Sequence, residues 1–127
     1  MRFGVSSYAY RYSAARILAS QGPAAAAQHV LGRSAAAGAE LVQFCDNVPL
    51  ADLSAEELDL LRREATRLGL ALDVGTRGIA LPGLRTYLAL AEELGSRALR
   101  LVPDTSDVAA IERSLRALLP DLARARI

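Results

Sequence analysis

Hydroxyl, amide, carboxylate and guanidinium side chains follow the ends of four apolar runs in this chain. This mixture is typical of pockets that bind polyols or phosphates. In a parallel α/β fold ligands bind at the carboxyl ends of the strands, so the four groups are expected to meet at one edge of a sheet. The groups are Ser6, Ser7, Tyr8 and Tyr10; Gln43, Phe44, Asp46 and Asn47; Asp73, Gly75, Thr76 and Arg77; and Arg100, Pro103 and Asp104.

Several of these side chains also have purely structural interpretations. Asp46 and Asp104 could accept hydrogen bonds from turn backbone, the commonest role of aspartate after a strand. Asp73 stands inside a predicted strand, where a buried carboxylate needs a partner, either Arg100 on the next strand or a ligand. Tyr8 could belong to a packed loop or to the pocket. Between Gly75 and Gly78, however, Arg77 could approach an anion together with backbone N–H groups.

Two further residues are expected to take no part in chemistry. His29 lies in a predicted helix remote from the strand ends, so we expect a structural or surface role. Cys45 has no histidine near it in sequence and is expected to be buried and inert. The chain has no zinc-ligand spacing, Walker loop, nucleophile elbow or paired-carboxylate motif.

The elements that position these side chains are predicted by a unit that recurs three times, a helix end, a glycine and an apolar strand. The glycines are Gly38, Gly69 and Gly95, and each could adopt the left-handed conformation that ends a helix. With the opening run 2–6, strands are expected to begin near residues 2, 40, 70 and 97. The resulting β-α-β-α-β-α-β-α order is a parallel (βα)4 arrangement, half of an eight-stranded barrel. An open doubly wound sheet is the alternative, but no Gly-x-Gly-x-x-Gly follows the first strand.

Helix boundaries are predicted from prolines and capping residues. A helix from Pro23 to about Ala37 is expected, and a second opens on the capping box of Ser54 and Glu57. Pro82 opens the third helix, and Asp107 caps a fourth that Pro120 breaks or kinks. The stretch between Ser6 and Pro23 is interpreted as an aromatic loop. The expected inward-facing helix positions are Leu58, Leu61, Ala65 and Leu68; Leu84, Leu88, Ala91 and Leu94; and Val108, Ile111, Leu115, Leu118 and Leu119.

Length and composition limit the classes of function. The 127 residues are expected to form one domain, 1–127, without a linker. All 15 basic residues are arginines, spread among 14 acids with a net charge of +1, so we expect no nucleic-acid partner. No apolar stretch approaches the roughly 20 residues of a membrane span, and no signal peptide is recognisable. The single cysteine excludes an internal disulfide, and a cytoplasmic location is the default.

Four stretches resemble the xylose-isomerase-like TIM barrels, the sugar phosphate isomerase/epimerase superfamily. They are Arg2-Phe-Gly-Val-Ser-Ser-Tyr8, Gly38-Ala-Glu-Leu-Val-Gln-Phe-Cys-Asp-Asn-Val-Pro-Leu50, Leu72-Asp-Val-Gly-Thr-Arg-Gly78 and Ala98-Leu-Arg-Leu-Val102. The likeness spans nearly the whole chain but only the N-terminal half of the family's barrel. It implies metal-dependent proton transfer through an enediolate on a small sugar or hydroxy-ketone, with a divalent ion such as Mn, Mg, Co or Zn.

By this resemblance the chain contributes the substrate side of the pocket and is inactive alone. The family's metal ligands come from later strands, so no metal is expected to bind this chain by itself, and whether it acts as an enzyme is left open. The related apurinic endonucleases carry histidines after the second and third strands, and this chain does not. The implied substrate-binding residues are Tyr8, Gln43, Asp46, Asn47, Asp73, Thr76 and Arg77.

The alternative function is a non-catalytic half-barrel that assembles or binds a small molecule. A half-barrel leaves two strand edges and an inner sheet face uncovered. We expect self-association or a missing C-terminal half-barrel to cover that face, because an exposed apolar surface costs stability. The candidate inner or interstrand residues are Val5, Val42, Leu72 and Val74.

Overall fold

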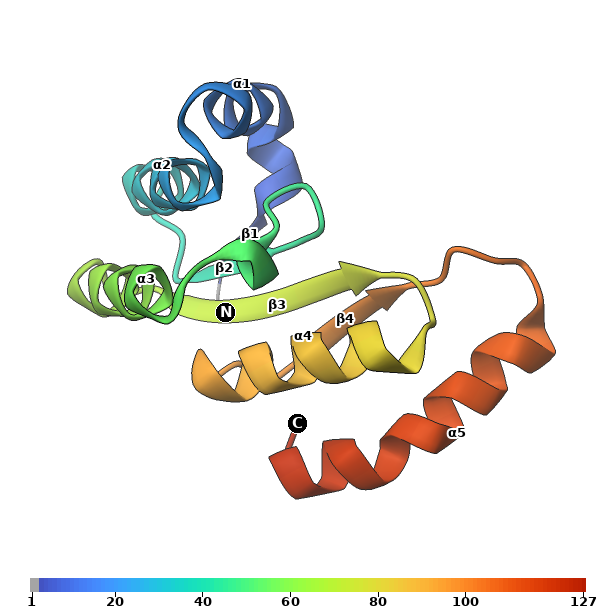
Figure 1. The fold of residues 1–127 in the computed structure, drawn as a ribbon. Coiled ribbons are helices and arrows are strands. Elements are labelled where there is room, and N and C mark those ends of the chain that lie inside the picture. Colours follow the sequence, from blue (N-terminus) through green and yellow to red (C-terminus); the bar gives the residue numbers. More distant parts are fainter. Residues whose placement is uncertain (1–2) are drawn as a thin grey trace.

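The computed structural model describes residues 3–127 as one four-stranded sheet with helices on one side (Figure 1). The strand order is β1-β2-β3-β4 and every neighbouring pair is parallel, which confirms the predicted (βα)4 half-barrel arrangement. The elements are β1 (Gly4–Ser6), the 3-10 helix η1 (Ser7–Tyr10), α1 (Arg11–Gln21), α2 (Pro23–Ala36), β2 (Leu41–Phe44), the 3-10 helix η2 (Leu50–Asp52), α3 (Ala55–Arg67), β3 (Ala71–Arg77), α4 (Leu81–Glu93), β4 (Leu99–Val102) and α5 (Val108–Ala125).

The repeated glycine ends its helix as predicted each time. Gly38, Gly69 and Gly95 have φ values of 78°, 71° and 67°, so the chain reverses after α2, α3 and α4 without a Cβ clash. The predicted strand starts lie within two residues of those observed for β2, β3 and β4. For β1 the described strand begins at Gly4, and the predicted residue Arg2 lies outside the described part of the chain.

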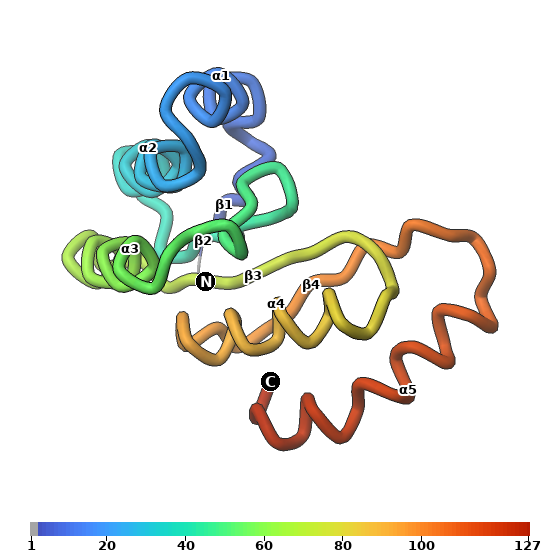
Figure 2. Tube along the Cα trace, viewed as in Figure 1, coloured from blue at the N-terminus to red at the C-terminus, as the bar shows by residue number. Residues whose placement is uncertain are grey.

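Helix α1 corrects the prediction of a loop between Ser6 and Pro23. Ala14 of this helix is fully buried and α1 packs along α2 (Figure 2). Gly22, with φ of 87°, separates the two helices, and Pro23 begins the second. The tyrosines at its start are typical of a loop, whereas the alanines and aliphatic residues that follow them favour a helix.

The helix-facing side of the sheet holds the core. Figure 1 shows α2, α3 and α4 following one another around the outside of the strands. Strand residues Val42, Phe44, Leu72 and Val74 are buried in one cluster with side chains of these helices, and Val5 packs against that cluster. Val5, Val42, Leu72 and Val74 were expected on the inner or interstrand surface; the inner-face assignment is wrong, because these side chains face the helices.

The residues that alternate with these core positions along each strand form a second surface, which we call the inner face. Since successive side chains alternate across a strand, the residues between the core positions point away from the helices. Parallel register then aligns them in rows, with Ser6 beside Gln43 and Gln43 beside Asp73. The inner face consists of Gly4, Ser6, Leu41, Gln43, Cys45, Ala71, Asp73, Gly75, Arg77, Arg100 and Val102. Apart from Leu41 and Val102, it is polar or small-chained.

Helix α5 lies at the far end of the row of helices and packs on α4. Asp107 caps it through a bond of 3.1 Å from the Ala110 N–H, as predicted. The helix does not break at Pro120 but continues to Ala125. Leu118 is buried against Leu84 and Leu88, whereas Val108, Leu115 and Leu119, expected to face inward, are exposed.

The capping box on α3 supplies a test of local helix stability. Ser54 Oγ accepts from the Glu57 N–H at 3.2 Å, and Glu57 Oε2 accepts from the Ser54 N–H at 2.8 Å. Ser54→Ala is expected to lower the free energy of unfolding by about 1 kcal/mol in urea titrations, because it leaves a helix-end donor without its partner. The control Ser20→Ala, at an exposed hydroxyl inside α1, should change it by less than about 0.5 kcal/mol. Equal effects would contradict the capping role.

Candidate functional site

Tyr8, Asp46 and Arg77 meet at the carboxyl edge of the sheet. The Tyr8 hydroxyl donates to Asp46 Oδ1 at 2.9 Å, and Arg77 Nε donates to Asp46 Oδ2 at 3.3 Å. Three segments far apart in the sequence, η1, the loop after β2 and the last residue of β3, are thereby joined. The structure brings together these three sequence-predicted residues, and the carboxylate of Asp46 is shared between the other two.

Ser7 and Asn47 fix the two loops that carry this cluster. Ser7 Oγ donates to Asn47 Oδ1 at 2.6 Å and accepts from the Cys45 N–H at 3.0 Å. Ser7 is fully buried, so these bonds are shielded from water. Asn47 Nδ2 is buried and has no hydrogen-bond partner among residues 3–127. Ser7 therefore positions the backbone from which Tyr8 and Asp46 extend.

Below this edge, polar groups of three strands converge on the Cys45 sulfur. Ser6 Oγ lies 3.5 Å from Sγ, Gln43 Oε1 lies 3.8 Å from it, and Arg100 Nη1 lies 3.5 Å from it. Cys45 is buried as predicted, although it lies on the inner face, because its neighbours cover it. Gln43 is thus a fourth sequence-predicted residue on the pocket side.

Gly75 lies between Cys45 and Arg100 and leaves room for both side chains. In register, Gly75 pairs with Arg100 on the neighbouring strand. A Cβ placed on Gly75 would lie 3.3 Å from Cys45 Sγ, slightly closer than ordinary van der Waals contact, and 3.4 Å from Arg100 Cβ. A glycine here lets the arginine side chain cross the sheet. The signal in the sequence was an arginine between two leucines in a predicted strand, a pattern that places Arg100 on the face opposite the core.

Arg100 carries an unpaired charge on the inner face. It is exposed and forms no ion pair with any other residue in the described range 3–127. Asp73, the carboxylate suggested as its partner by sequence, instead accepts from Ser96 Oγ at 3.1 Å and from the Arg97 N–H at 3.3 Å. A guanidinium without a carboxylate partner is a ready donor to an anionic ligand.

Two of the predicted binding residues lie apart from this cluster. Asp73 is engaged near the amino end of β4 through Ser96 and Arg97, away from the Tyr8 edge. Thr76 is 6% exposed and pairs in register with Leu101, which packs in the cluster between α4 and α5. Thr76 therefore faces the helices rather than the inner face.

The Tyr8 cluster shifts two pKa values. The hydrogen bond to Asp46, followed by burial and the negative charge of that carboxylate, raises the pKa of Tyr8, while Arg77 opposes the shift. The hydrogen bond with Tyr8 and the contact with Asp46 raise the pKa of Arg77 further. Tyr8 is therefore a neutral hydrogen-bond donor near pH 7 and Arg77 is a cation.

The donor set does not fit a divalent cation. Among residues 3–127 no group of three or more His, Cys, Asp or Glu side chains is placed to hold a metal ion. The one carboxylate of the cluster, Asp46, already accepts from Tyr8 and Arg77, and a second guanidinium, Arg100, lies on the same side. Two positive charges beside one engaged carboxylate favour an anion.

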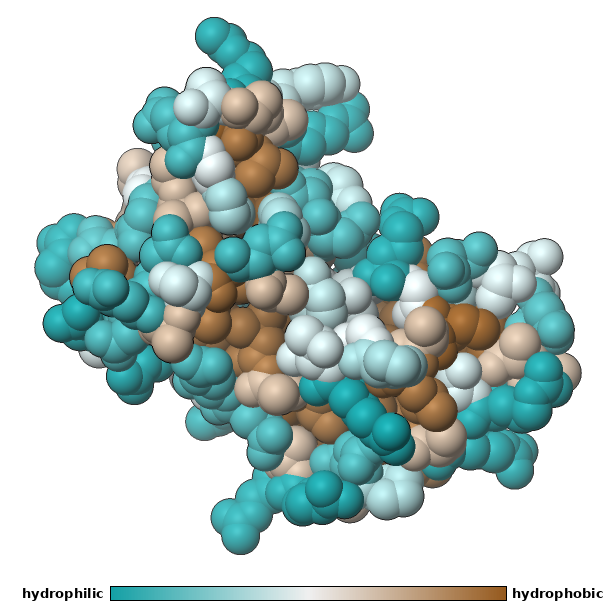
Figure 3. Space-filling view, viewed as in Figure 1, coloured by the Kyte–Doolittle hydropathy of each residue, from teal (hydrophilic) through white to brown (hydrophobic). Residues whose placement is uncertain are grey.

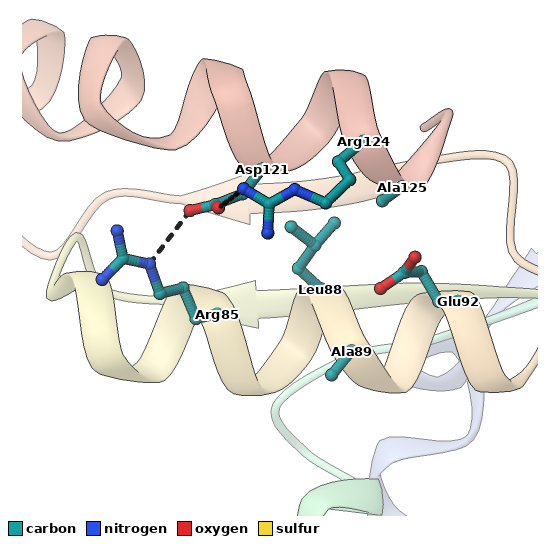
Figure 4. A pocket seen from close by; sticks show the side chains of 7 residues that line it. All are labelled: Arg85, Leu88, Ala89, Glu92, Asp121, Arg124 and Ala125. Carbon is teal, nitrogen blue, oxygen red and sulfur yellow. Dashed lines mark hydrogen bonds and ion pairs between the residues drawn. The ribbon is translucent and has the colours of Figure 1, made fainter.

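A groove between α4 and α5 is a different feature of the molecule. It encloses about 220 Å³, and in it Asp121 lies between Arg85 and Arg124, at 3.0 and 3.2 Å (Figure 4). The Arg85–Asp121 pair joins α4 to α5, and the Arg124–Asp121 pair lies within α5. His29 has a structural contact as well: its Nε2 lies 2.9 Å from Ser13 Oγ, which links α2 to α1.

Within residues 3–127 no helix is both long and apolar enough to cross a membrane.

The whole of this chain is similar to part of one known enzyme. It is 34% identical over 135 residues to 3-oxo-isoapionate decarboxylase of Pectobacterium atrosepticum. The match covers 100% of this chain but 46% of that protein, so the chain spans about half the length of the relative. No family model matches the sequence. The similarity is thus to part of an enzyme named for a carbohydrate substrate.

The pKa of Tyr8 tests the geometry of the edge cluster. Asp46→Asn is expected to lower the pKa of Tyr8, since it removes the carboxylate that raises it and leaves Arg77 to act alone. The raised pKa also means that the contribution of Tyr8 to stability is full below about pH 10 and is lost as the pH rises through the folded-state value. The measurement is an NMR titration of labelled tyrosine, with Tyr8→Phe to assign the signal. Asp59→Asn on α3 is the control and should leave the titration unchanged.

Gly75 supplies a second test, and its control variant is expected to change the free energy of unfolding in the opposite direction. Gly75→Ala is expected to lower the free energy of unfolding by about 1–3 kcal/mol, because its methyl group crowds Cys45 and Arg100. Gly83→Ala, in α4 with open space around its Cβ, should raise it by up to about 1 kcal/mol, because alanine favours helix. Chemical denaturation measures both. A Gly75→Ala variant as stable as the wild type would argue against the close approach.

Proposed function

We propose that this chain forms the substrate-binding half of a barrel enzyme that acts on a carbohydrate acid. The observation that carries the proposal is Arg100, an exposed guanidinium held across the inner face with no acidic partner among the described residues. The planar fork of an arginine matches a carboxylate in a bidentate manner. The named substrate of the relative is a 3-oxo acid, which has such a carboxylate.

The hydroxyl groups of the substrate would meet the polar side chains around Arg100. Gln43 and Ser6 extend from the neighbouring strands on the same face and offer amide and hydroxyl groups. At the carboxyl edge, Tyr8 and Arg77 flank Asp46 and could bind oxygens farther along the molecule. A row of alternating donors and acceptors of this kind fits a polyhydroxylated chain better than an apolar ligand.

The reaction proposed for the whole barrel is decarboxylation of a 3-oxo acid. The bond between C1 and C2 breaks, C1 leaves as carbon dioxide, and the electron pair passes through C2 to the C3 carbonyl oxygen, which gives an enolate. A proton then adds to C2. Arg100 would orient the carboxylate in the ground state, and a cation near the C3 oxygen would stabilise the enolate as its charge develops.

Sugar isomerisation or epimerisation, the activity implied by the family resemblance, passes through a closely related enediolate. The binding side of the pocket would serve either reaction, and the decarboxylase is favoured by the name of the relative and by the free cation. In both cases the proton-transferring groups and any divalent metal would come from outside this chain. Asp46, bonded to Tyr8 and Arg77, is not free to act as a base.

Binding of a stable sugar acid tests this proposal on the chain itself. Gluconate, which carries a carboxylate and no 3-oxo group, is expected to bind more tightly than sorbitol, its neutral counterpart. Arg100→Gln should weaken gluconate binding by roughly tenfold or more and leave sorbitol binding unchanged, because it removes a charge-assisted hydrogen bond. Calorimetry or ligand-observed NMR gives both affinities.

The matched control is Arg97→Gln, at an exposed arginine just before β4 whose backbone, not its side chain, is tied to Asp73. It should bind gluconate like the wild type. Equal losses in the two variants, or no preference of the wild type for gluconate over sorbitol, would contradict the assignment of Arg100 as the carboxylate anchor.

A further inference from the structure

Two guanidinium groups come together at the carboxyl end of β2. Arg77 of β3 donates its Nε–H to Asp46 Oδ2 at 3.3 Å, and Arg100 Nη1 of β4 lies 3.5 Å from Cys45 Sγ. Cys45 and Asp46 are consecutive residues, and the Cα atoms of consecutive residues are about 3.8 Å apart. The two arginine side chains therefore extend from different strands toward the same part of the sheet.

Both arginines also belong to the same surface. Gly75 pairs with Arg100 in register, and Arg77 lies two residues farther along the strand that carries Gly75, so both arginines are on the inner face. Gly75 has no side chain that would separate them. A small ligand on this face can therefore contact both guanidinium groups.

The two positive charges are only partly balanced. Among residues 3–127, Asp46 is the one carboxylate that pairs with either arginine, and it also accepts from the Tyr8 hydroxyl at 2.9 Å. Asp104, which lies over the neighbouring Gly78, forms no ion pair within the same range. The Arg77 side chain is 56% exposed and Arg100 is exposed as well, so both guanidinium groups remain accessible to a ligand.

The surroundings of this pair are polar, unlike the contact that joins α4 and α5. Figure 3 shows hydrophobic side chains gathered between those two helices, where Leu88 and Leu118 are buried. Beside the arginines, Ser6 and Gln43 instead offer a hydroxyl and an amide on the inner face. Polar neighbours and two cations fit a small ligand with more than one charged oxygen group.

We propose that Arg77 binds the C3 oxygen of the 3-oxo acid while Arg100 holds its C1 carboxylate. This inference rests on the proposed function and assigns a second catalytic residue in the same pocket. The bound acid carries one negative charge, on C1. As the C1–C2 bond breaks, its electron pair forms the C2–C3 double bond, the carbonyl pair passes to the C3 oxygen, and neutral carbon dioxide leaves.

The negative charge thus moves from the oxygens at Arg100 to the oxygen at Arg77. A cation at the C3 oxygen interacts weakly with the neutral carbonyl of the substrate and strongly with the enolate, so it lowers the barrier rather than only tightening binding. The pocket is therefore expected to favour ligands that carry charge at C1 and at C3 together.

Two stable three-carbon acids test the role of Arg77 on this chain. Hydroxymalonate has a C1 carboxylate, a C2 hydroxyl and charged oxygens on C3, whereas glycerate differs in having a neutral C3 hydroxyl. The wild type is expected to bind hydroxymalonate roughly tenfold or more tightly, because Arg77 meets a full charge only in that ligand. Arg77→Gln should remove this preference and leave glycerate binding unchanged, which also shows that the variant is folded. Calorimetry or ligand-observed NMR measures both affinities.

Arg62→Gln is the matched control. The Arg62 side chain on α3 is likewise 56% exposed and likewise pairs with an aspartate, Asp59, at 2.7 Å, so the variant makes the same change in net charge on a helix surface. It should keep the full preference for hydroxymalonate. The assignment of Arg77 is overturned by a wild type without the preference, by a preference that survives Arg77→Gln or that Arg62→Gln also removes, and by an equal loss of both ligands in Arg77→Gln.

Arg100→Gln separates this inference from the proposed function. It should weaken both ligands, since both have the C1 carboxylate. If both affinities stay unchanged, the carboxylate anchor is wrong, and the assignment of Arg77 to C3 is wrong with it. If both ligands weaken but the preference for hydroxymalonate does not depend on Arg77, the carboxylate anchor stands and only the role of Arg77 is wrong.

Discussion

Every feature of this molecule depends on the parallel register that gives the sheet two unlike faces. Because partners in neighbouring parallel strands point to the same side, one choice of parity fixes the surroundings of whole rows of side chains. Val42, Leu72 and Val5 form a row under the helices, and the next row, Ser6, Gln43 and Asp73, lies on the inner face. A shift of one residue in a single strand would bury a glutamine or a carboxylate among leucines, so the core and the candidate site stabilise the same register.

Local signals in the sequence predicted the elements well. Glycines with positive φ, the capping box of Ser54 and the cap at Asp107 each act within a few residues, and the structure has all of them where they were expected. The missed helix α1 has weaker local signals. Its first residues are tyrosine and serine, and its stability comes from packing along α2, including the fully buried Ala14, which a single sequence does not display.

The orientation of the strands could not be predicted in the same way. In a run such as Leu41-Val42-Gln43-Phe44-Cys45, apolar residues occupy both parities, so periodicity does not say which set meets the helices. The pairs that define the site also join distant segments. Nothing in the sequence places Gly75 between Cys45 and Arg100. For Asp73 the sequence suggests either Arg100 or a ligand as partner, whereas its hydrogen bonds come from Ser96 and Arg97. Strand-end position alone correctly grouped Tyr8, Asp46 and Arg77.

The polarity of the inner face changes the physical reason for expecting a partner. An apolar inner face would be costly in water, but Ser6, Gln43 and Arg100 remain well solvated there, so little stability is lost while that face stays open. The remaining cost lies at the margins, in unpaired strand edges and in apolar side chains such as Leu119. A partner is therefore favoured by the ends of the sheet rather than by its face, and a pocket can stay filled with water until a polar ligand enters it. Unpaired strand edges beside exposed apolar side chains, together with a solvated polar face, are the properties that one half of a binding barrel needs.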